Sequence, residues 1–152
     1  MNINFENYEY NGAWYGTEKV DFNGQSIEVD VQIDGYDDSM IPESGKNAFL
    51  DFLNILNHNT AKISEAVFQY YCERREELGF ADEVNADYPA VSKPEEILKM
   101  ITLIGITVPD QEAYDEVAVS LVFNCTWDKE NGLGICFIGE DIEDIGFQDI
   151  AL

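Results

Sequence analysis

Residues 117–127 read VAVSLVFNCTW, and this stretch decides the class of fold. Apolar side chains stand at every second position along it, which is the period of a strand with one buried face. A turn at 128–132 then leads into a second apolar alternation that begins at Leu133. A β-branched run at 104–108 precedes it, and we expect a last strand at 145–150 to close the sheet edge. The C-terminal third therefore predicts a β-meander.

The N-terminal part of the chain also predicts strands. Residues 27–33 alternate apolar with acidic or amide side chains, which is typical of a strand with one wet face. A second short apolar run at 20–22 lies just before it, and Asn23-Gly24 between them favours the positive backbone angles of a type I′ turn. A further strand pair is expected at 5–10 and 14–15.

The middle of the chain changes to the helical period. Apolar residues at 48–56 fall on one stripe of a helix of about four turns. After an interruption at 57–60, a second helix is expected up to Leu78-Gly79, so the two predict a helical hairpin. Ser92 and Glu95 have the spacing of a capping box and mark the start of a short third helix. The apolar face of this third helix would be Ile97, Leu98 and Ile101.

These elements predict an α+β fold with a mainly antiparallel sheet, built from N-terminal hairpins and a C-terminal meander. The helical hairpin and the short third helix would pack on one face of that sheet. Residues 80–93 are polar and predict an irregular surface connection. Because no repeat, linker or low-complexity tract divides the chain, we expect residues 1–152 to form a single domain.

The charge of the chain restricts its partners. Thirty-one acidic residues against 8 basic ones leave a formal net charge of -23, whereas the hydrophobic fraction of 45% is that of a folded globule. Nucleic acid is a poor partner for such a surface, and a basic protein or a cation suits it better. No run approaches the roughly 20 apolar residues of a membrane span, so we expect a cytoplasmic protein without membrane contact.

Residues suited to catalysis are few. His58 is the only histidine, and it falls between two predicted helices, where a turn residue is the simpler interpretation. Carboxylates at 128–130 and 140–144 could bind a hard cation, but neither group has the spacing of a calcium loop. We therefore expect no catalytic residue, no metal site and no cofactor, and we interpret the chain as a protein that is not an enzyme.

An interface is the alternative use of this surface. The acids of the predicted strand at 27–33 would point outward, and the loop that follows it carries a tyrosine flanked by carboxylates. Tyrosine beside charge is common where proteins bind one another. The partner-binding residues expected on these grounds are Glu28, Asp30, Asp34, Tyr36, Asp37 and Asp38.

The segment CTWDKENGLG at 125–134, followed by GFQDIAL at 146–152, resembles a family of uncharacterised bacterial domains. Members of that family carry a Trp-Asp-x-Glu-His-Gly hairpin, an apolar strand and a Gly-x-x-Asp ending. Asn131 stands where their histidine is usual, which favours a structural role for the turn. The structural residues implied by this resemblance and by turn chemistry are Trp127, Asp128, Glu130, Gly132, Gly146 and Asp149.

Small acidic α+β domains are also similar in size, charge and class to the immunity proteins of bacterial toxin systems. The leading hypothesis is therefore an acidic protein-binding module, an immunity protein that blocks a basic, nuclease-like toxin. One alternative is a housekeeping or regulatory domain without a toxin partner. A third hypothesis is a carboxylate-based hydrolase or a cation-binding protein.

Overall fold

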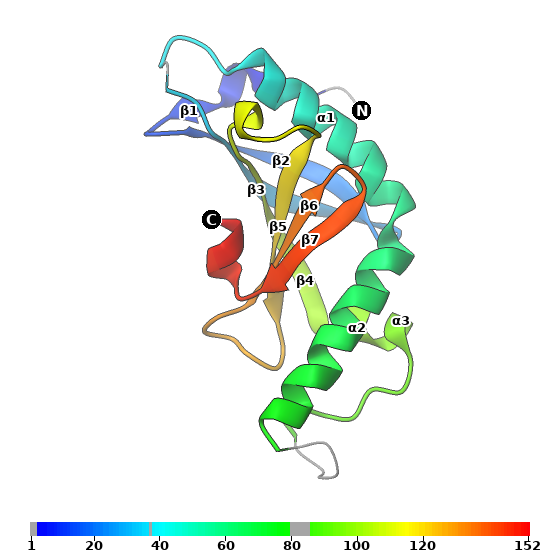
Figure 1. Ribbon diagram of the computed structural model, residues 1–152. Coiled ribbons are helices and arrows are strands. Elements are labelled where there is room, and N and C mark those ends of the chain that lie inside the picture. Colours follow the sequence, from blue (N-terminus) through cyan, green and yellow to red (C-terminus); the bar gives the residue numbers. More distant parts are fainter. Residues whose placement is uncertain (1–2, 37, 80–85) are drawn as a thin grey trace.

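Seven strands form one sheet, and their order in space follows their order in the sequence (Figure 1). The computed structural model describes residues 3–36, 38–79 and 86–152. All neighbouring strands are antiparallel except β3 and β4, which are parallel. The predicted α+β fold with a mainly antiparallel sheet is therefore confirmed. The strands are β1 (Glu9–Tyr10), β2 (Trp14–Phe22), β3 (Gln25–Ile33), β4 (Ile101–Val108), β5 (Ala118–Cys125), β6 (Leu133–Ile138) and β7 (Asp141–Gly146).

The hairpin of β2 and β3 forms as predicted. Asn23 and Gly24 have φ of 52° and 74°, so both occupy the left-handed region that a type I′ turn requires. The two strands pair without interruption from Phe22 opposite Gln25 to Trp14 opposite Ile33. Because side chains alternate along a strand, this register turns Val29 and the other apolar residues of β3 to one face and the acids to the other.

The helices α1 (Glu43–His58) and α2 (Thr60–Glu77) lie in the connection from β3 to β4. Parallel neighbours need such a crossover, and Figure 1 shows both helices on one face of the sheet. The prediction of two successive helices is confirmed, but they do not form the predicted helical hairpin. Only Asn59 separates the two helices, so they follow each other end to end and do not fold back side by side. The short α3 (Pro94–Ile97) packs against α2 and continues into a 3₁₀ turn, η2 (Leu98–Met100).

The core lies between these helices and the sheet. The ring centroids of Phe52 in α1 and Phe137 in β6 are 5.2 Å apart in an edge-to-face contact. Farther along the sheet, the rings of Tyr71 in α2 and Trp127 lie 4.8 Å apart. Both contacts join a helix to the C-terminal meander. The helices therefore cover one face of the sheet, and the opposite face has no helix on it.

A last strand closes the sheet edge as predicted, but the predicted bounds of 145–150 are wrong. The strand β7 ends at Gly146, and Gln148–Ala151 form a 3₁₀ turn, η4. The reason is a hydrogen bond from the backbone N–H of Gln148 to the carbonyl of Asn131 at 2.9 Å, which directs the chain toward the 128–132 hairpin. The last residues then fold over the helix-free face of β5 and β6 and do not extend the sheet edge.

Two further boundaries differ from expectation around the third helix. Its N-cap is Lys93, with extended backbone angles that the following Pro94 favours, and Ser92 donates its hydroxyl to Glu96 instead of capping the helix. Ile101 does not belong to the helix, because β4 begins there and not at residue 104.

Within the described residues, no helix combines the length and the apolar character that a membrane span requires.

The first prediction concerns the contact of α1 with the sheet. Phe52 is fully buried, so Phe52→Ala leaves a cavity and should lower the free energy of unfolding by about 3–5 kcal/mol. Leu50 lies on the exposed side of the same helix, and Leu50→Ala is the control, expected to change it by about 0.5 kcal/mol or less. Urea unfolding followed by circular dichroism measures both. Equal effects would contradict this placement of the helix.

Candidate functional site

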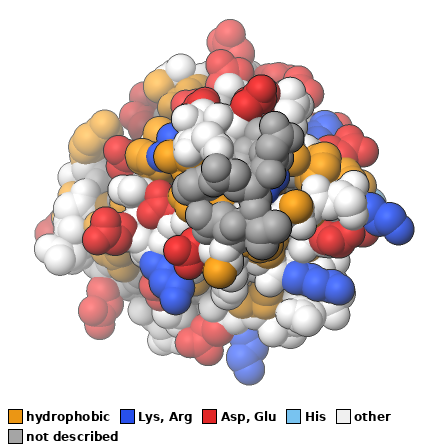
Figure 2. Space-filling model, turned by 90° about the horizontal axis from the view of Figure 1, so that it is seen from below, with side chains coloured by type: hydrophobic (Ala, Val, Ile, Leu, Met, Phe, Trp, Pro, Cys, Tyr) orange, Lys and Arg blue, Asp and Glu red, His pale blue; other side chains and the backbone are white. Residues whose placement is uncertain are grey.

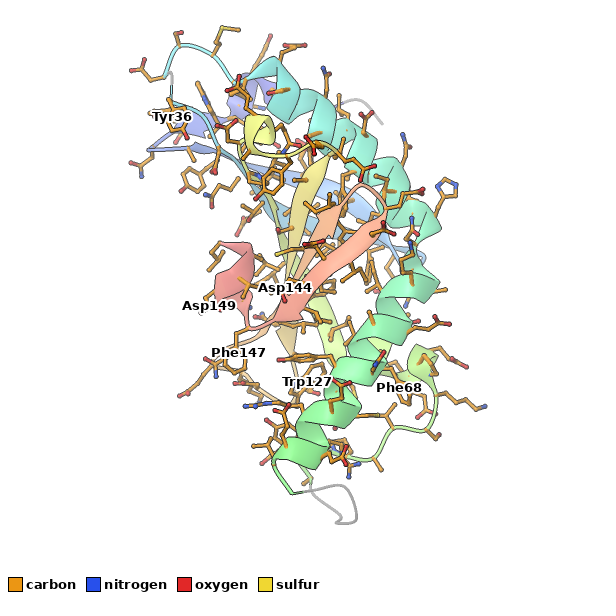
Figure 3. The ribbon with its side chains drawn as sticks, viewed as in Figure 1. Tyr36, Phe68, Trp127, Asp144, Phe147 and Asp149 are labelled. Atoms are coloured by element: carbon orange, nitrogen blue, oxygen red, sulfur yellow. The ribbon has the colours of Figure 1, made fainter. Side chains whose placement is uncertain are left out.

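The structure separates the predicted partner-binding residues into two groups. Glu28 and Asp30 lie exposed on β3, on the helix-free face of the sheet. Asp34, Tyr36 and Asp38 lie in the loop after β3, and Asp37 falls outside the described residues. Six residues of strand separate Glu28 from Asp34, a distance of about 20 Å. Figure 3 shows Tyr36 at the upper end of the molecule.

The parallel pairing of β3 and β4 brings a second acidic segment beside that loop. The N–H of Asp34 donates to the carbonyl of Val108, the last residue of β4, at 2.9 Å. The chain after β4 then forms a 3₁₀ turn, η3 (Gln111–Ala113), capped by the Asp110 carboxylate, which accepts from the N–H of Glu112 at 3.1 Å. A small hollow of about 140 Å³ lies between the two segments.

We define the acidic end as the described residues of 34–51 together with 109–117. Figure 1 shows these segments together at the top, where the loop after β3, the start of α1 and η3 meet. Lys46 is the only basic residue among them, and its ammonium group lies 5.5 Å from the ring centroid of Phe5. The carboxylates of the acidic end are those of Asp34, Asp38, Glu43, Asp51, Asp110, Glu112, Asp115 and Glu116.

Large apolar side chains are exposed within the acidic end. The exposed fractions are 89% for Tyr36, 58% for Met40 and 42% for Tyr114. Neither of the two ion pairs found among the described residues, Lys62–Asp141 and Arg74–Glu77, involves these carboxylates. Exposed aromatic rings among unpaired charges of one sign are the surface that a complementary protein covers most favourably.

Sequence reasoning missed the part of this surface at 109–117. The signal was present, since the segment PDQEAYDE at 109–116 follows a β-branched run directly. The segment could be assigned to this surface only once β4 was known to be parallel to β3. The C-terminal ends of neighbouring parallel strands lie at the same end of the sheet, so the segments that follow them lie close together.

The helix-free face holds a larger hollow of about 550 Å³. Its floor is crossed by a row of paired residues, in which Thr17 lies opposite Asp30, Asp30 opposite Gly105, and Gly105 opposite Val122. A β-bulge between Leu103 and Gly105 interrupts the register of β4. The hollow is further lined by Tyr15, Gln32, Ile104, Thr107, Gln148 and Leu152.

One wall of this hollow comes from the second C-terminal motif, residues 146–152, through Gln148 and Leu152. The structure brings this motif against the first one, residues 125–134. The side-chain N–H of Gln148 donates to the carbonyl of Phe123 at 2.7 Å and to the side-chain oxygen of Asn124 at 3.2 Å. The thiol of Cys136 donates to the carbonyl of Ile150 at 3.4 Å. These contacts hold η4 on the sheet (Figure 3).

The hairpin at 128–132 is held by one aspartate. The Asp128 carboxylate accepts from the backbone N–H of Asn131 at 3.1 Å and from its side-chain amide at 3.0 Å. Trp127 is buried at the base, whereas Glu130 is exposed. Gly132 has a φ of +62°, and a Cβ there would collide with the side chain of Gln148. Gly146 ends β7 beneath Ile150, and Asp149 is exposed on η4.

Basic residues gather at the opposite end from the acidic end. Figure 2 shows Lys and Arg side chains distributed among acids on the lower end of the molecule. The guanidinium of Arg74 lies 5.5 Å from the ring centroid of Phe147, and Lys129 shares a shallow hollow with Met100 and Cys125. Five of the 8 basic residues, Arg74, Arg75, Lys93, Lys99 and Lys129, come from the end of α2, the α3–η2 region and the 128–132 hairpin.

His58 and the Cys125 thiol, two groups suited to chemistry, lie on different elements. His58 is exposed at the end of α1, with Nδ1 2.8 Å from the carbonyl oxygen of Asn54. Burial raises the pKa of the Cys125 thiol to about 11, and the thiol contacts the carbonyl of Asp128 at 3.4 Å. Within residues 3–36, 38–79 and 86–152, no three His, Cys, Asp or Glu side chains come together as metal ligands would.

A family described as a domain of unknown function, DUF6985, matches residues 4–152. The chain belongs to this family. The match includes every strand and helix described above, so the expected resemblance to a domain of uncharacterised function is confirmed at the level of the family. No curated protein and no solved structure matches the chain. For this DUF6985 domain, the roles expected for the hairpin residues and the likeness to immunity proteins stay predictions.

The second prediction tests the junction of the two C-terminal motifs in the DUF6985 domain. Gly24→Ala and Gly132→Ala both place a Cβ at positive φ, but Gly24 has open space around it whereas Gly132 faces Gln148. Gly24→Ala should cost about 1 kcal/mol of unfolding free energy, and Gly132→Ala at least about 1 kcal/mol more. Urea unfolding compares the two. Equal costs would show that Gln148 does not lie against the turn.

Proposed function

We propose that this chain is an acidic protein-binding module that docks its acidic end on a basic protein. The observation that carries the proposal is the composition of that end, where eight carboxylates and four exposed apolar side chains, Leu50 among them, accompany a single lysine in the described residues. Complementary charge raises the rate of association and penalises wrong partners. The exposed rings of Tyr36 and Tyr114 would supply the apolar contacts that charge alone lacks.

The partner in this proposal is a nuclease-like toxin, and the chain acts as its immunity protein. A nuclease must bind a polyanion, so its active cleft is basic. A folded surface of high negative charge would compete for that cleft and keep the nucleic acid out. The distribution of the basic residues supports this orientation, because five of the 8 lie at the end of the molecule that faces away from the docked surface.

The third prediction tests whether the position of the charge matters. Replacing Asp34, Asp110 and Glu112 together by Asn, Asn and Gln should lower the association rate constant with the toxin at least about tenfold at low salt. Neutralising Glu65, Glu76 and Glu95 to Gln changes the net charge equally on exposed helix positions, and it should change the rate constant less than about twofold. Stopped-flow or surface-binding kinetics at several salt concentrations measure both.

The proposal predicts that a basic toxin domain is encoded beside the gene of this chain, and that domain, co-expressed with the chain, is the probe for this experiment. Rescue of growth and a complex at low salt are expected. The proposal fails if neither is found, or if the two triple variants lower the rate constant equally, since the acidity would then act as a whole and not through the acidic end.

A further inference from the structure

The hollow on the helix-free face differs in chemistry from the acidic end. Ile104, Gly105 and Val122 make its floor apolar, and the ring of Tyr15 stands at its edge. Among the described residues that line it, Asp30 is the only one with a charged side chain. This single charge beside an apolar floor distinguishes the hollow from the acidic end.

The contacts around Gly105 do not require a glycine at this position. A Cβ on Gly105 would lie 3.5 Å from the carbonyl oxygen of Asp30 and 3.5 Å from Cβ of Val122, which are ordinary contacts. The φ of Gly105 lies outside the left-handed region, so other residues could adopt this backbone. A Cβ at position 105 would thus be tolerated by its immediate neighbours, and its absence adds space to the floor of the hollow.

The Asp30 carboxylate is available to a ligand. Within the part of the chain that the structure describes, it makes no hydrogen bond and no ion pair, and it is exposed. Lys19, the basic residue on this face of β2, lies opposite Glu28, two pairs farther along the strand than Asp30. Lys19 is therefore paired across the strands with Glu28 and not with Asp30.

We infer that this hollow binds an arginine side chain of the basic partner. The aliphatic stem would cover Ile104 and Val122, the guanidinium would donate to the two oxygens of Asp30, and its flat face would lie on the ring of Tyr15. Lysine has no planar fork for such a bidentate contact. A hollow of about 550 Å³ also holds the backbone on either side of the arginine.

The position of the hollow allows one partner to reach both surfaces. Gln32 lines the hollow and Asp34 lines the small hollow of the acidic end, two residues farther along the chain. The identity of the protein that carries the arginine rests on the proposed function. The chemistry of the hollow does not, because it follows from the residues that line it.

The fourth prediction uses N-acetyl-arginine amide as the probe, followed by the amide NMR signals of the protein. Shifts are expected at Tyr15, Thr17 and Gly105. The citrulline analogue keeps the length of the side chain without its charge, and the norleucine analogue keeps only an aliphatic stem. Both should bind at least about fivefold more weakly. Asp30→Asn and Gly105→Leu should weaken arginine binding to a similar degree, whereas Glu28→Gln, on the same face of β3 but outside the hollow, should leave it unchanged.

Two results would overturn the inference. Equal binding of norleucine and arginine would show a merely apolar site, and arginine shifts confined to the acidic end would show unspecific attraction. If Gly105→Leu does not fold, Asp30→Asn with the matched Glu28→Gln decides the question alone. Arginine binding in the hollow without any toxin complex would contradict the proposed function only, whereas a toxin complex of unchanged affinity with Asp30→Asn would contradict the hollow only.

Discussion

The parallel pairing of β3 and β4 is the constraint on which the rest of the structure depends. Parallel neighbours cannot be joined by a tight turn, so the chain must cross back over the sheet, and α1 and α2 make that crossing. Their apolar stripes bury one face of the sheet and leave the other without helices. The same pairing brings the segments that follow β3 and β4 side by side at one end of these two strands. Both candidate surfaces, the acidic end and the open hollow, follow from this single pairing.

Local patterns predicted the parts of the fold that local physics determines. The alternation along 27–33 and the positive φ values of Asn23 and Gly24 depend on neighbours in the sequence, and they specified the β2–β3 hairpin correctly. The pairing of Asp30 with Gly105 joins residues far apart in the chain, and no periodic pattern of apolar residues predicts such a pairing. That is why Asp34 and Tyr36 were predicted for an interface while Asp110 and Glu112 beside them were not. The end of β7 at Gly146 was missed for the same reason, because the hydrogen bond from Gln148 to Asn131 is tertiary.

The distribution of charge has a cost that the core must offset. Carboxylates crowded at one end repel one another and destabilise the folded state, more strongly at low ionic strength. Nothing in the packing of α1 on the sheet calls for acids at 109–117, which lie outside the core. A basic partner would remove that repulsion on binding, so the destabilising feature of the free chain becomes a favourable term in the complex.

The edges of the sheet bear on how a partner could bind. One edge consists of β1, only two residues long, and of the part of β2 after Tyr15, which carries Glu18, Lys19 and Asp21. The other edge is β7, whose pairing with β6 is broken by a bulge between Cys136 and Phe137. The β7 edge also carries the acids Asp141, Glu143 and Asp144. Short, bulged and charged edges resist the addition of a further strand. A partner that adds a strand to the sheet would therefore meet poor templates at both ends, whereas the acidic end and the open face offer side chains. Recognition through side chains makes the choice of partner depend on charge and shape, which is the requirement for a specific inhibitor.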